Sequence, residues 1–349
     1  MTFGDSLAEI SLPTALRQRL QALGFQPEML GTTLSGQWRG QQDRTEARGG
    51  KRITDLLYLR PLSAADDNTV EPLPLGAEAR YLALPATGMH MLSRKHYNPF
   101  LRRATGANLD GSAIDHNLIV KSLNTGFVGL SQTVTLGGTE ARIVGFVSGA
   151  YGGVGVYRLD RSVSAYSGNI ISTECARCVA NGEVFDVRFY LQRFGLSDPD
   201  WIIISAGTND FLNLMHGANG LADLAQVVRF GVDRLHGAFR LALPEAHIVF
   251  FNAALGSNPQ FRSFEPNHRL LMRVTRDAVK QSADPLSHWI NAAIWQSESS
   301  DWSIHPAGQD LEAEANTIAD LIATVQAEWP SSIGQSRGIS TSRKMPSSK

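Results

Sequence analysis

Four short stretches of the sequence contain the residue types that acyl transfer requires. They are GDSL at residues 4–7, EARGGKRI at 46–53, GTND at 207–210 and DWSIHPAG at 301–308. Ser6 supplies a hydroxyl nucleophile and His305 a base able to accept its proton. Asn209 offers a side-chain amide, and Gly50 a backbone N–H that no bulky side chain shields. Each stretch alone is more often an ordinary turn or loop, but together they supply the nucleophile, base and oxyanion donors of ester hydrolysis.

The elements around these stretches predict an α/β fold with a parallel sheet. Trp201 to Ile204 form a continuous apolar run, which is typical of a strand buried on both faces, and residues 247–253 repeat the pattern. A short strand running into a loop is expected at 28–33 and a weaker strand at 288–294, with helices at 11–24, 221–241, 266–282 and 308–329. This alternation predicts βαβ units with right-handed crossovers. The four stretches would then lie at the carboxyl edge of the sheet, where open α/β sheets build their active sites.

The four stretches also resemble the sequence blocks of the SGNH, or GDSL-type, serine hydrolases, which carry Ser, Gly, Asn and His in this order. The Ser block is FGDSL, the Asn block SAGTND and the His block IHPAG. GTTLSG followed by EARGGKRI is similar to the Gly block of carbohydrate-esterase-like members, and residues 181–210 resemble the approach to the third block. The resemblance covers about residues 1–60 and 180–330. It implies a three-layer αβα, flavodoxin-like parallel sheet (the SGNH hydrolase fold) in one domain over residues 1–330.

The resemblance also implies a role for each motif residue. Ser6 would attack the ester carbonyl, and His305 would deprotonate Ser6 and later activate water. The N–H groups of Ser6 and Gly50 and the side chain of Asn209 would form the oxyanion hole. Gly49 competes with Gly50 for the second donor, and Gly50 is preferred because a large residue follows it, as in the family.

The third member of the catalytic set departs from the family pattern. The family places an Asp three residues before the His, where this chain has Trp302, and the nearest acid is Asp301, four residues before His305. Either Asp301 reaches the imidazole through a bulged loop, or a backbone carbonyl orients it and a Ser–His dyad operates. Asp5 and Asp210 are expected to hold loops together rather than to take part in the chemistry.

The middle and both ends of the chain differ from this α/β pattern. Residues 75–179 are rich in Gly, Ser and Thr and contain strand-like runs such as ARIVGFVSG. We therefore expect a β-rich insertion and not a separate linker-bounded domain. Residues 331–349 lack periodicity and are expected to form a disordered tail. Only Met1 to Phe3 precede GDSL, where about five strand residues are usual, which favours a start that cuts into the first strand.

Composition limits the partners. The chain has 349 residues, of which 43% are hydrophobic and 19% charged, and a net charge of -1. A sizeable core is expected, while nucleic acid or an anionic membrane is not expected as the main partner. No apolar run approaches the ~20 residues of a membrane span. No signal peptide is visible, so the chain as given reads as cytoplasmic, or as exported if its start is truncated.

The remaining candidates for metal or redox chemistry are weak. Cys175 and Cys178 form a lone CxxC, which fits a redox motif, half a zinc site or a small disulfide loop. No second pair exists for a four-cysteine zinc site, and structural or incidental thiols are favoured. No Gly-rich loop has the spacing of a phosphate or dinucleotide site. No cofactor or metal is expected, and no role is assigned to His90, His96, His236, His247 and His268.

The sequence thus predicts a serine esterase that hydrolyses short-acyl esters. The Gly block favours an O-acetyl ester on a carbohydrate, so the expected partner is a small-molecule or carbohydrate ester. One alternative is a lipid-directed esterase, thioesterase or lysophospholipase on the same fold. Another is a catalytically silent glycan-binding module that uses the insertion. The oligomeric state and the natural ester are left open by the sequence.

Overall fold

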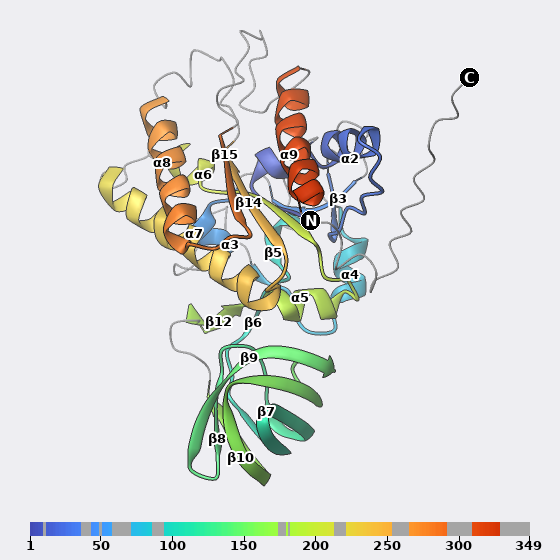
Figure 1. The fold of residues 1–349 in the computed structure, drawn as a ribbon, viewed down its shortest axis with the longest axis vertical. Helices are drawn as coiled ribbons and strands as arrows, with labels where there is room; N and C mark the ends of the chain where they lie inside the picture. The colour runs from blue at the N-terminus through green and yellow to red at the C-terminus, as the bar shows by residue number, and fades with distance from the viewer. Residues whose placement is uncertain are drawn as a thin grey trace, which may run out of the picture.

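The computed structural model describes most of the chain. The described residues are 1–9, 12–35, 43–48, 51–57, 71–85, 94–173, 179–180, 182–212, 221–252, 265–291 and 309–328. They form an α/β body and a β-rich part that extends from one end of the body (Figure 1). Several of the sequence candidates lie outside the described residues: Gly50 and its competitor Gly49, Cys175, Cys178, Asp301 and His305.

The main sheet of the body is mostly parallel. Within the described ranges its order is β15 (Ser287–Asn291), β14 (His247–Asn252), β13 (Trp201–Ser205), β1 (Thr2–Gly4), β3 (Arg44–Ala47) and β2 (Thr33–Leu34). All neighbours pair in parallel except β2, which runs antiparallel to β3. Counted along the chain, the parallel strands have the spatial order 2-1-3-4-5. The order reverses between β1 and β13, so the ligand crevice of such a sheet is expected at their carboxyl ends.

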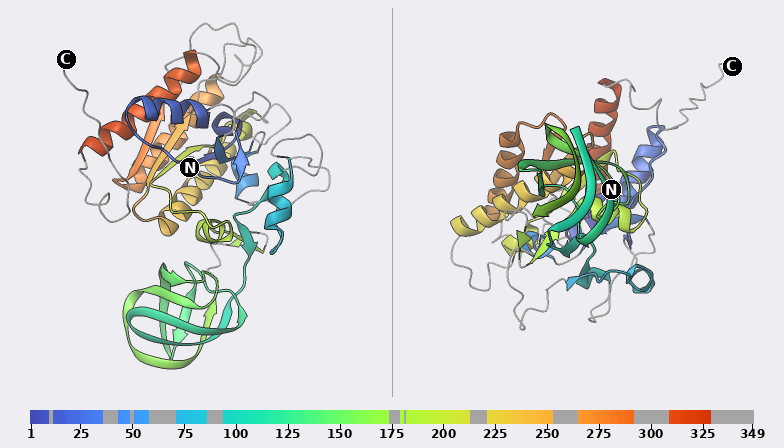
Figure 2. Two further views of the ribbon diagram at one scale, coloured as in Figure 1. Left: turned by 90° about the vertical axis from the view of Figure 1, so that its right-hand side faces the viewer. Right: turned by 90° about the horizontal axis from the view of Figure 1, so that it is seen from below.

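Helices cover both faces of this sheet (Figures 1 and 2). On one face, α2 (Leu12–Ala22) and α9 (Gln309–Glu328) pack against residues such as Ile203. On the other face, α5 (Val187–Arg193), α7 (Leu221–Ala242) and α8 (Glu265–Ser282) pack around Ile202 and Ile204. Successive strand side chains point to opposite faces, which explains why a fully apolar strand is needed at this position.

Most of the elements expected from sequence are present. The helices predicted at 11–24, 221–241, 266–282 and 308–329 agree with α2, α7, α8 and α9 to within two residues at each end. The short strand expected within 28–33 is present only from Thr33, where β2 begins. The neighbouring Thr32 donates its backbone N–H to the carboxylate of Glu46 instead of to a strand ladder. A side chain therefore satisfies the backbone N–H of Thr32.

The short first strand lies in the middle of the sheet. The backbone of β1 pairs with β13 on one side and β3 on the other. Phe3 is fully buried, and its ring meets those of Phe100 and Phe239 edge-on at 5.4 and 5.3 Å between centroids. Neighbouring strands thus satisfy the backbone of β1 on both edges, and aromatic rings cover its apolar side.

The β-rich part consists mainly of long antiparallel strands, which we call the β lobe (residues 107–173). Its sheet order, within the described residues, is β7 (Ala107–Gly126), β10 (Gly155–Thr173), β8 (Thr133–Leu136) and β9 (Thr139–Gly149), and β9 also pairs with β10. The two ends of the lobe return to the body through a small sheet of β6 (Leu101–Arg103), β12 (Glu183–Phe185) and β11 (Val179–Ala180). The left panel of Figure 2 shows the lobe projecting from the body.

Shorter elements fill the stretch before the β lobe. They are β4 (Glu71–Pro72), α4 (Glu78–Ala83), the 3-10 helix η2 (Arg94–His96) and β5 (Tyr97–Asn98). β4 and β5 pair in parallel. In the described part of the stretch predicted as a β-rich insertion at 75–179, the first element is a helix and the first strand begins at Tyr97.

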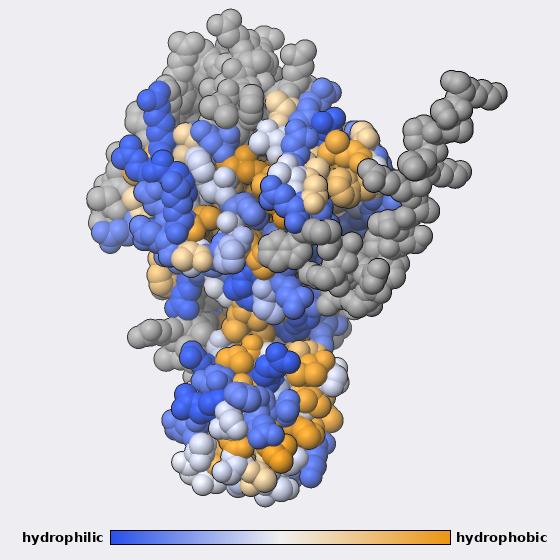
Figure 3. Space-filling model, in the orientation of Figure 1, coloured by the Kyte–Doolittle hydropathy of each residue, from blue (hydrophilic) through white to orange (hydrophobic). Residues whose placement is uncertain are grey.

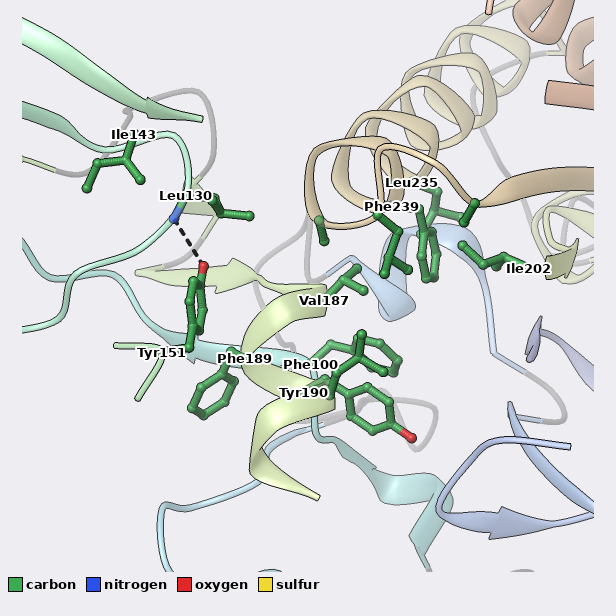
Figure 4. Packing of buried hydrophobic residues seen from close by; sticks show 14 of the residues in the cluster. Phe100, Leu130, Ile143, Tyr151, Val187, Phe189, Tyr190, Ile202, Leu235 and Phe239 are labelled. Atoms are coloured by element: carbon green, nitrogen blue, oxygen red, sulfur yellow. Dashed lines mark hydrogen bonds between the residues drawn. The ribbon is translucent and has the colours of Figure 1, made fainter. Parts of the chain in front are cut away.

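One continuous apolar core joins the β lobe to the body. Figure 4 shows Leu130 and Tyr151 of the lobe facing α5, whose Val187 lies on the way to Phe239 of α7. Tyr151 accepts a hydrogen bond from the Leu130 N–H at 3.0 Å and donates to Asp186 at 2.9 Å. Arg102 also donates to Asp186, at 2.9 Å. The junction is therefore packed and hydrogen-bonded rather than a bare linker.

The outer surface of the β lobe mixes polar and apolar side chains. Its exposed apolar residues are Ile114, Ile119, Val147, Val154 and Ile171. Figure 3 shows apolar areas on the lobe beside polar ones. Exposed apolar side chains are common on folded proteins, and the lobe interior remains the main apolar region.

Candidate functional site

The turn after β1 places Ser6 at the carboxyl edge of the sheet. Gly4 has φ +128°, and a Cβ there would lie 1.6 Å from the carbonyl oxygen of Ser205 on β13. The chain thus passes so close to β13 that only glycine fits. Ser6 then begins the short helix α1 (Ser6–Glu9). Asp5, just before it, accepts the N–H of Leu7 at 3.0 Å, in the manner of a helix N-cap.

The turn after β13 places Asn209 beside that of β1. Gly207 has φ +100°, and a Cβ there would lie 2.8 Å from a methyl carbon of Leu271. Asn209 lies in α6 (Thr208–Leu212) and donates one side-chain N–H to the carbonyl oxygen of Lys51 at 3.0 Å. An amide NH₂ has two N–H donors. The bond to Lys51 fixes the plane of the amide and leaves its second N–H for another acceptor.

The segment after β3 lies against both turns. The Arg48 N–H donates to the carbonyl of Gly4 at 2.7 Å, and the Lys51 N–H donates to the carbonyl of Arg48 at 3.3 Å. At the start of α3 (Ile53–Leu56), the Ile53 N–H donates to the carboxylate of Asp210 at 2.8 Å. The described residues on either side of Gly49 and Gly50 are thereby tied to the ends of β1 and β13.

Two buried carboxyl groups hold these turns. Burial raises the pKa of Asp5 to about 7, although its carboxylate accepts hydrogen bonds from Leu7 and Ser205. Burial also raises the pKa of Asp210 to about 7, although the hydrogen bond from the Ile53 N–H acts to lower it. Both residues connect loops, as expected from sequence: Asp5 joins the turns after β1 and β13, and Asp210 joins those after β13 and β3.

The structure thus brings together part of the site expected from sequence. The backbone of Ser6 and the side chain of Asn209 lie at neighbouring strand ends, at the point where the strand order reverses. His305 and Asp301 belong to the segment between β15 and α9, which lies outside the described residues, as does Gly50. Their positions remain predictions.

Sequence reasoning missed the buried residues at the turn after β3. Glu46 and Arg48 are fully buried and paired, with 3.0 Å between Oε2 and the guanidinium. Glu46 also accepts hydrogen bonds from the hydroxyl groups of Thr32 and Tyr190. The guanidinium of Arg48 donates a hydrogen bond to the Tyr81 hydroxyl at 3.2 Å. Opposite charges two residues apart at the end of a buried strand were the available signal, because such residues share one face of the strand.

Two further features concern absences within the described residues. No three side chains of His, Cys, Asp or Glu gather there in a way that could hold a metal ion. Among the helices that the structure describes, none combines the length and apolar character of a membrane span. His236, given no role from sequence, contacts Asp284 at 2.8 Å and Ser287 at 2.9 Å.

Comparison with known proteins gives distant structural similarity only. No family model and no curated protein matches the chain. A peptidoglycan O-acetylesterase is 14% identical, with 94% of this chain and 91% of that chain covered and a TM-score of 0.36. A carbohydrate acetylesterase from Sinorhizobium meliloti is 18% identical, over 36% of this chain and 61% of that one, at a TM-score of 0.28. A family-two carbohydrate esterase from Cellvibrio japonicus is 11% identical, over 64% and 90%, also at a TM-score of 0.28.

Proposed function

We propose that the protein is a serine ester hydrolase with a flavodoxin-like, three-layer αβα body. The observation that carries the proposal is the juxtaposition of the Ser6 turn and the Asn209 amide at the carboxyl ends of β1 and β13. That edge is where open parallel sheets with the order 2-1-3-4-5 bind their ligands. The helices on both sheet faces support the three-layer assignment.

In this mechanism Ser6 Oγ attacks the ester carbonyl while His305 accepts its proton. The negative charge that develops on the carbonyl oxygen is stabilised by the N–H groups of Ser6 and Gly50 and by the second side-chain N–H of Asn209. Collapse of the intermediate breaks the ester C–O bond, and His305 returns the proton to the leaving alcohol. Water, deprotonated by His305, then releases the acid and restores Ser6.

The hydrogen bond from Asn209 to Lys51 supports the oxyanion role. A donor contributes most to catalysis when it is fixed before charge develops, since no reorganisation is then needed in the transition state. The carbonyl of Lys51 orients the amide, and the Lys51 backbone is itself held by Arg48. Asn209 is therefore a preorganised donor rather than a freely rotating side chain.

We propose short acyl esters, chiefly O-acetyl groups on a carbohydrate, as the substrates. The proposal rests on the Gly-block resemblance of residues 46–53 and on the lack of a long apolar helix in the sequence that would line an acyl tunnel. Faster cleavage of long-chain than of acetyl esters would replace it with the lipid-directed alternative.

Hydrolysis of p-nitrophenyl acetate by the wild type and Ser6→Ala tests the reaction. Ser164→Ala, at an exposed serine of the β lobe, is the matched control and should keep full activity. Equal background rates in the wild type and Ser6→Ala would overturn the esterase assignment and favour a binding module.

A second pair of variants tests the base. His305→Ala should abolish turnover. Asp301→Ala should lower kcat by a large factor if Asp301 orients the imidazole, and should change it little if a Ser–His dyad operates.

A further inference from the structure

Arg48 forms a fully buried hub directly after the end of β3. Its guanidinium makes four hydrogen bonds from three nitrogen atoms. Nε donates to the carbonyl of Tyr97 at 3.0 Å, and one terminal nitrogen donates to the backbone carbonyl of Glu46 at 2.9 Å. The other donates to the Glu46 carboxylate at 3.0 Å and to the Tyr81 hydroxyl at 3.2 Å. The side chain therefore has a single fixed orientation.

Glu46 is held with equal completeness. One carboxylate oxygen accepts from the Thr32 hydroxyl at 2.5 Å, from the Thr32 backbone N–H and from the Tyr190 hydroxyl. The other oxygen accepts from Arg48. Burial raises the pKa of Tyr190 well above its ordinary value, so the hydroxyl keeps its proton and acts as a donor. The Glu46–Arg48 pair is thus hydrogen-bonded to the residue before β2 and to α4, α5 and β5.

The backbone of Arg48 connects this hub to the candidate site. Its N–H donates to the carbonyl of Gly4, two residues before Ser6, and its carbonyl accepts from the Lys51 N–H. Lys51 in turn accepts from the Asn209 side chain. Arg48 therefore has its side chain in the buried hub, while its backbone links the ends of β1 and β3 to Lys51, the acceptor for Asn209.

Stability alone is a poor reason for such a pair. Two charges removed from water lose more solvation than their attraction commonly restores, and a well-packed apolar pair is often as stable. A buried ion pair with every hydrogen bond directed is better suited to fixing one local arrangement.

We propose that Glu46 and Arg48 are positioning residues for catalysis, which hold the backbone of Arg48 and Lys51 so that the Lys51 carbonyl aims the Asn209 amide at the oxyanion formed at Ser6. The inference rests on the proposed esterase function. Neither side chain is assigned contact with the substrate. Their effect should fall on kcat, because the turn acts on the transition state more than on the bound ester.

Arg48→Lys is the test variant, because lysine keeps the charge but cannot reproduce the four directed bonds of the guanidinium. Its kcat for p-nitrophenyl acetate should fall by about 10²-fold with KM nearly unchanged, the loss expected for a misplaced catalytic group. The double variant Glu46→Gln with Arg48→Met removes both buried charges. It replaces Arg48→Lys as the test variant if Arg48→Lys does not fold. The matched control is Arg102→Lys, which loosens the buried pair with Asp186 at the lobe junction and should leave kcat unchanged.

Hydrogen exchange supplies a readout independent of activity. The backbone amides of Arg48, Lys51, Arg52 and Ile53 all have described acceptors. They should exchange at least about tenfold faster in Arg48→Lys than in the wild type, but not in Arg102→Lys. Unchanged exchange would show that the pair does not hold the turn. Faster exchange in Arg48→Lys together with a wild-type kcat would overturn the catalytic role of the pair. A wild-type protein without esterase activity would overturn the esterase assignment, and the exchange rates would then still test whether the pair holds the turn.

Discussion

The side-chain amide of Asn209 is bonded to the backbone carbonyl of Lys51, at 3.0 Å across 158 positions of sequence. This bond joins the turn after β13 to the turn after β3, and the N–H of Arg48 joins the latter to β1. The ends of β1, β3 and β13 are thus part of one hydrogen-bonded unit that includes Asn209. Its rigidity is what the proposed chemistry requires.

Removing the amide of Asn209 should reduce turnover without unfolding the protein. Loss of one oxyanion donor typically lowers kcat by about 10²–10³-fold, and this is expected for Asn209→Ala. Asn209→Asp keeps the shape but has no N–H, and should be as inactive. Steady-state kinetics of p-nitrophenyl acetate hydrolysis check both variants, and a kcat within twofold of the wild type in either would remove Asn209 from the site.

Gly4 should not accept a side chain. The Cβ of Gly4→Ala would meet the Ser205 carbonyl at 1.6 Å in a backbone conformation of φ +128°, so a loss of several kcal/mol in the free energy of unfolding is expected. Gly237→Ala is the control, because its Cβ meets nothing within 4 Å on helix α7, and alanine favours a helix. Urea unfolding compares them. Equal stability of the two variants would mean that β1 and β13 do not approach this closely.

The β lobe should unfold together with the body. Tyr151→Phe leaves the buried Leu130 N–H without its acceptor, at a cost of about 1–3 kcal/mol. Tyr166→Phe removes an exposed bond to Asn169 and should cost much less. Thermal unfolding should give a single transition in the wild type, because one apolar core spans both parts. Two separate transitions would contradict this and indicate an independent lobe.

The sequence predicted the elements whose residues determine them locally. The β13 run of Trp201 to Ile204 and the amphipathic α7 and α8 follow directly from apolar spacing. Ser6 and Asn209 were found because their motifs end such strands. These features needed no knowledge of distant contacts.

Other features depend on partners far along the chain. Thr32 binds Glu46 in place of a strand ladder, and Tyr190 reaches Glu46 across 144 positions. Neither contact leaves a periodic signal around its own residue. The same holds for Tyr151 and Asp186 at the lobe junction, which are 35 positions apart in the sequence.

The buried carboxyls should make stability depend on pH. Asp5 and Asp210 have pKa values of about 7 in the folded chain against an ordinary 3.8. Between about pH 4 and pH 7 the folded state therefore binds protons that the unfolded chain has released, so the free energy of unfolding falls as pH rises. The fall should be on the order of a few kcal/mol for each carboxyl, with full stability below pH 4.

The variant Asp5→Asn with Asp210→Asn should flatten this slope, since asparagine carries no titrating proton but keeps an oxygen acceptor. Both positions are changed because both carboxyls have raised pKa values, and the charge of Asp5 contributes to the raised pKa of Asp210. Urea unfolding at pH 4.5, 6 and 7.5 measures the slope. Parallel slopes in the wild type and the double variant would show that other groups control it.

Covalent labelling tests the identity of the nucleophile most directly. A fluorophosphonate reacts with an activated serine and forms a stable adduct in which the serine oxygen replaces fluoride. Mass spectrometry of the digested protein should place one adduct on Ser6, and Ser6→Ala should remain unlabelled. An adduct on another residue, or sustained ester hydrolysis by wild-type protein whose Ser6 stays unmodified, would contradict the account.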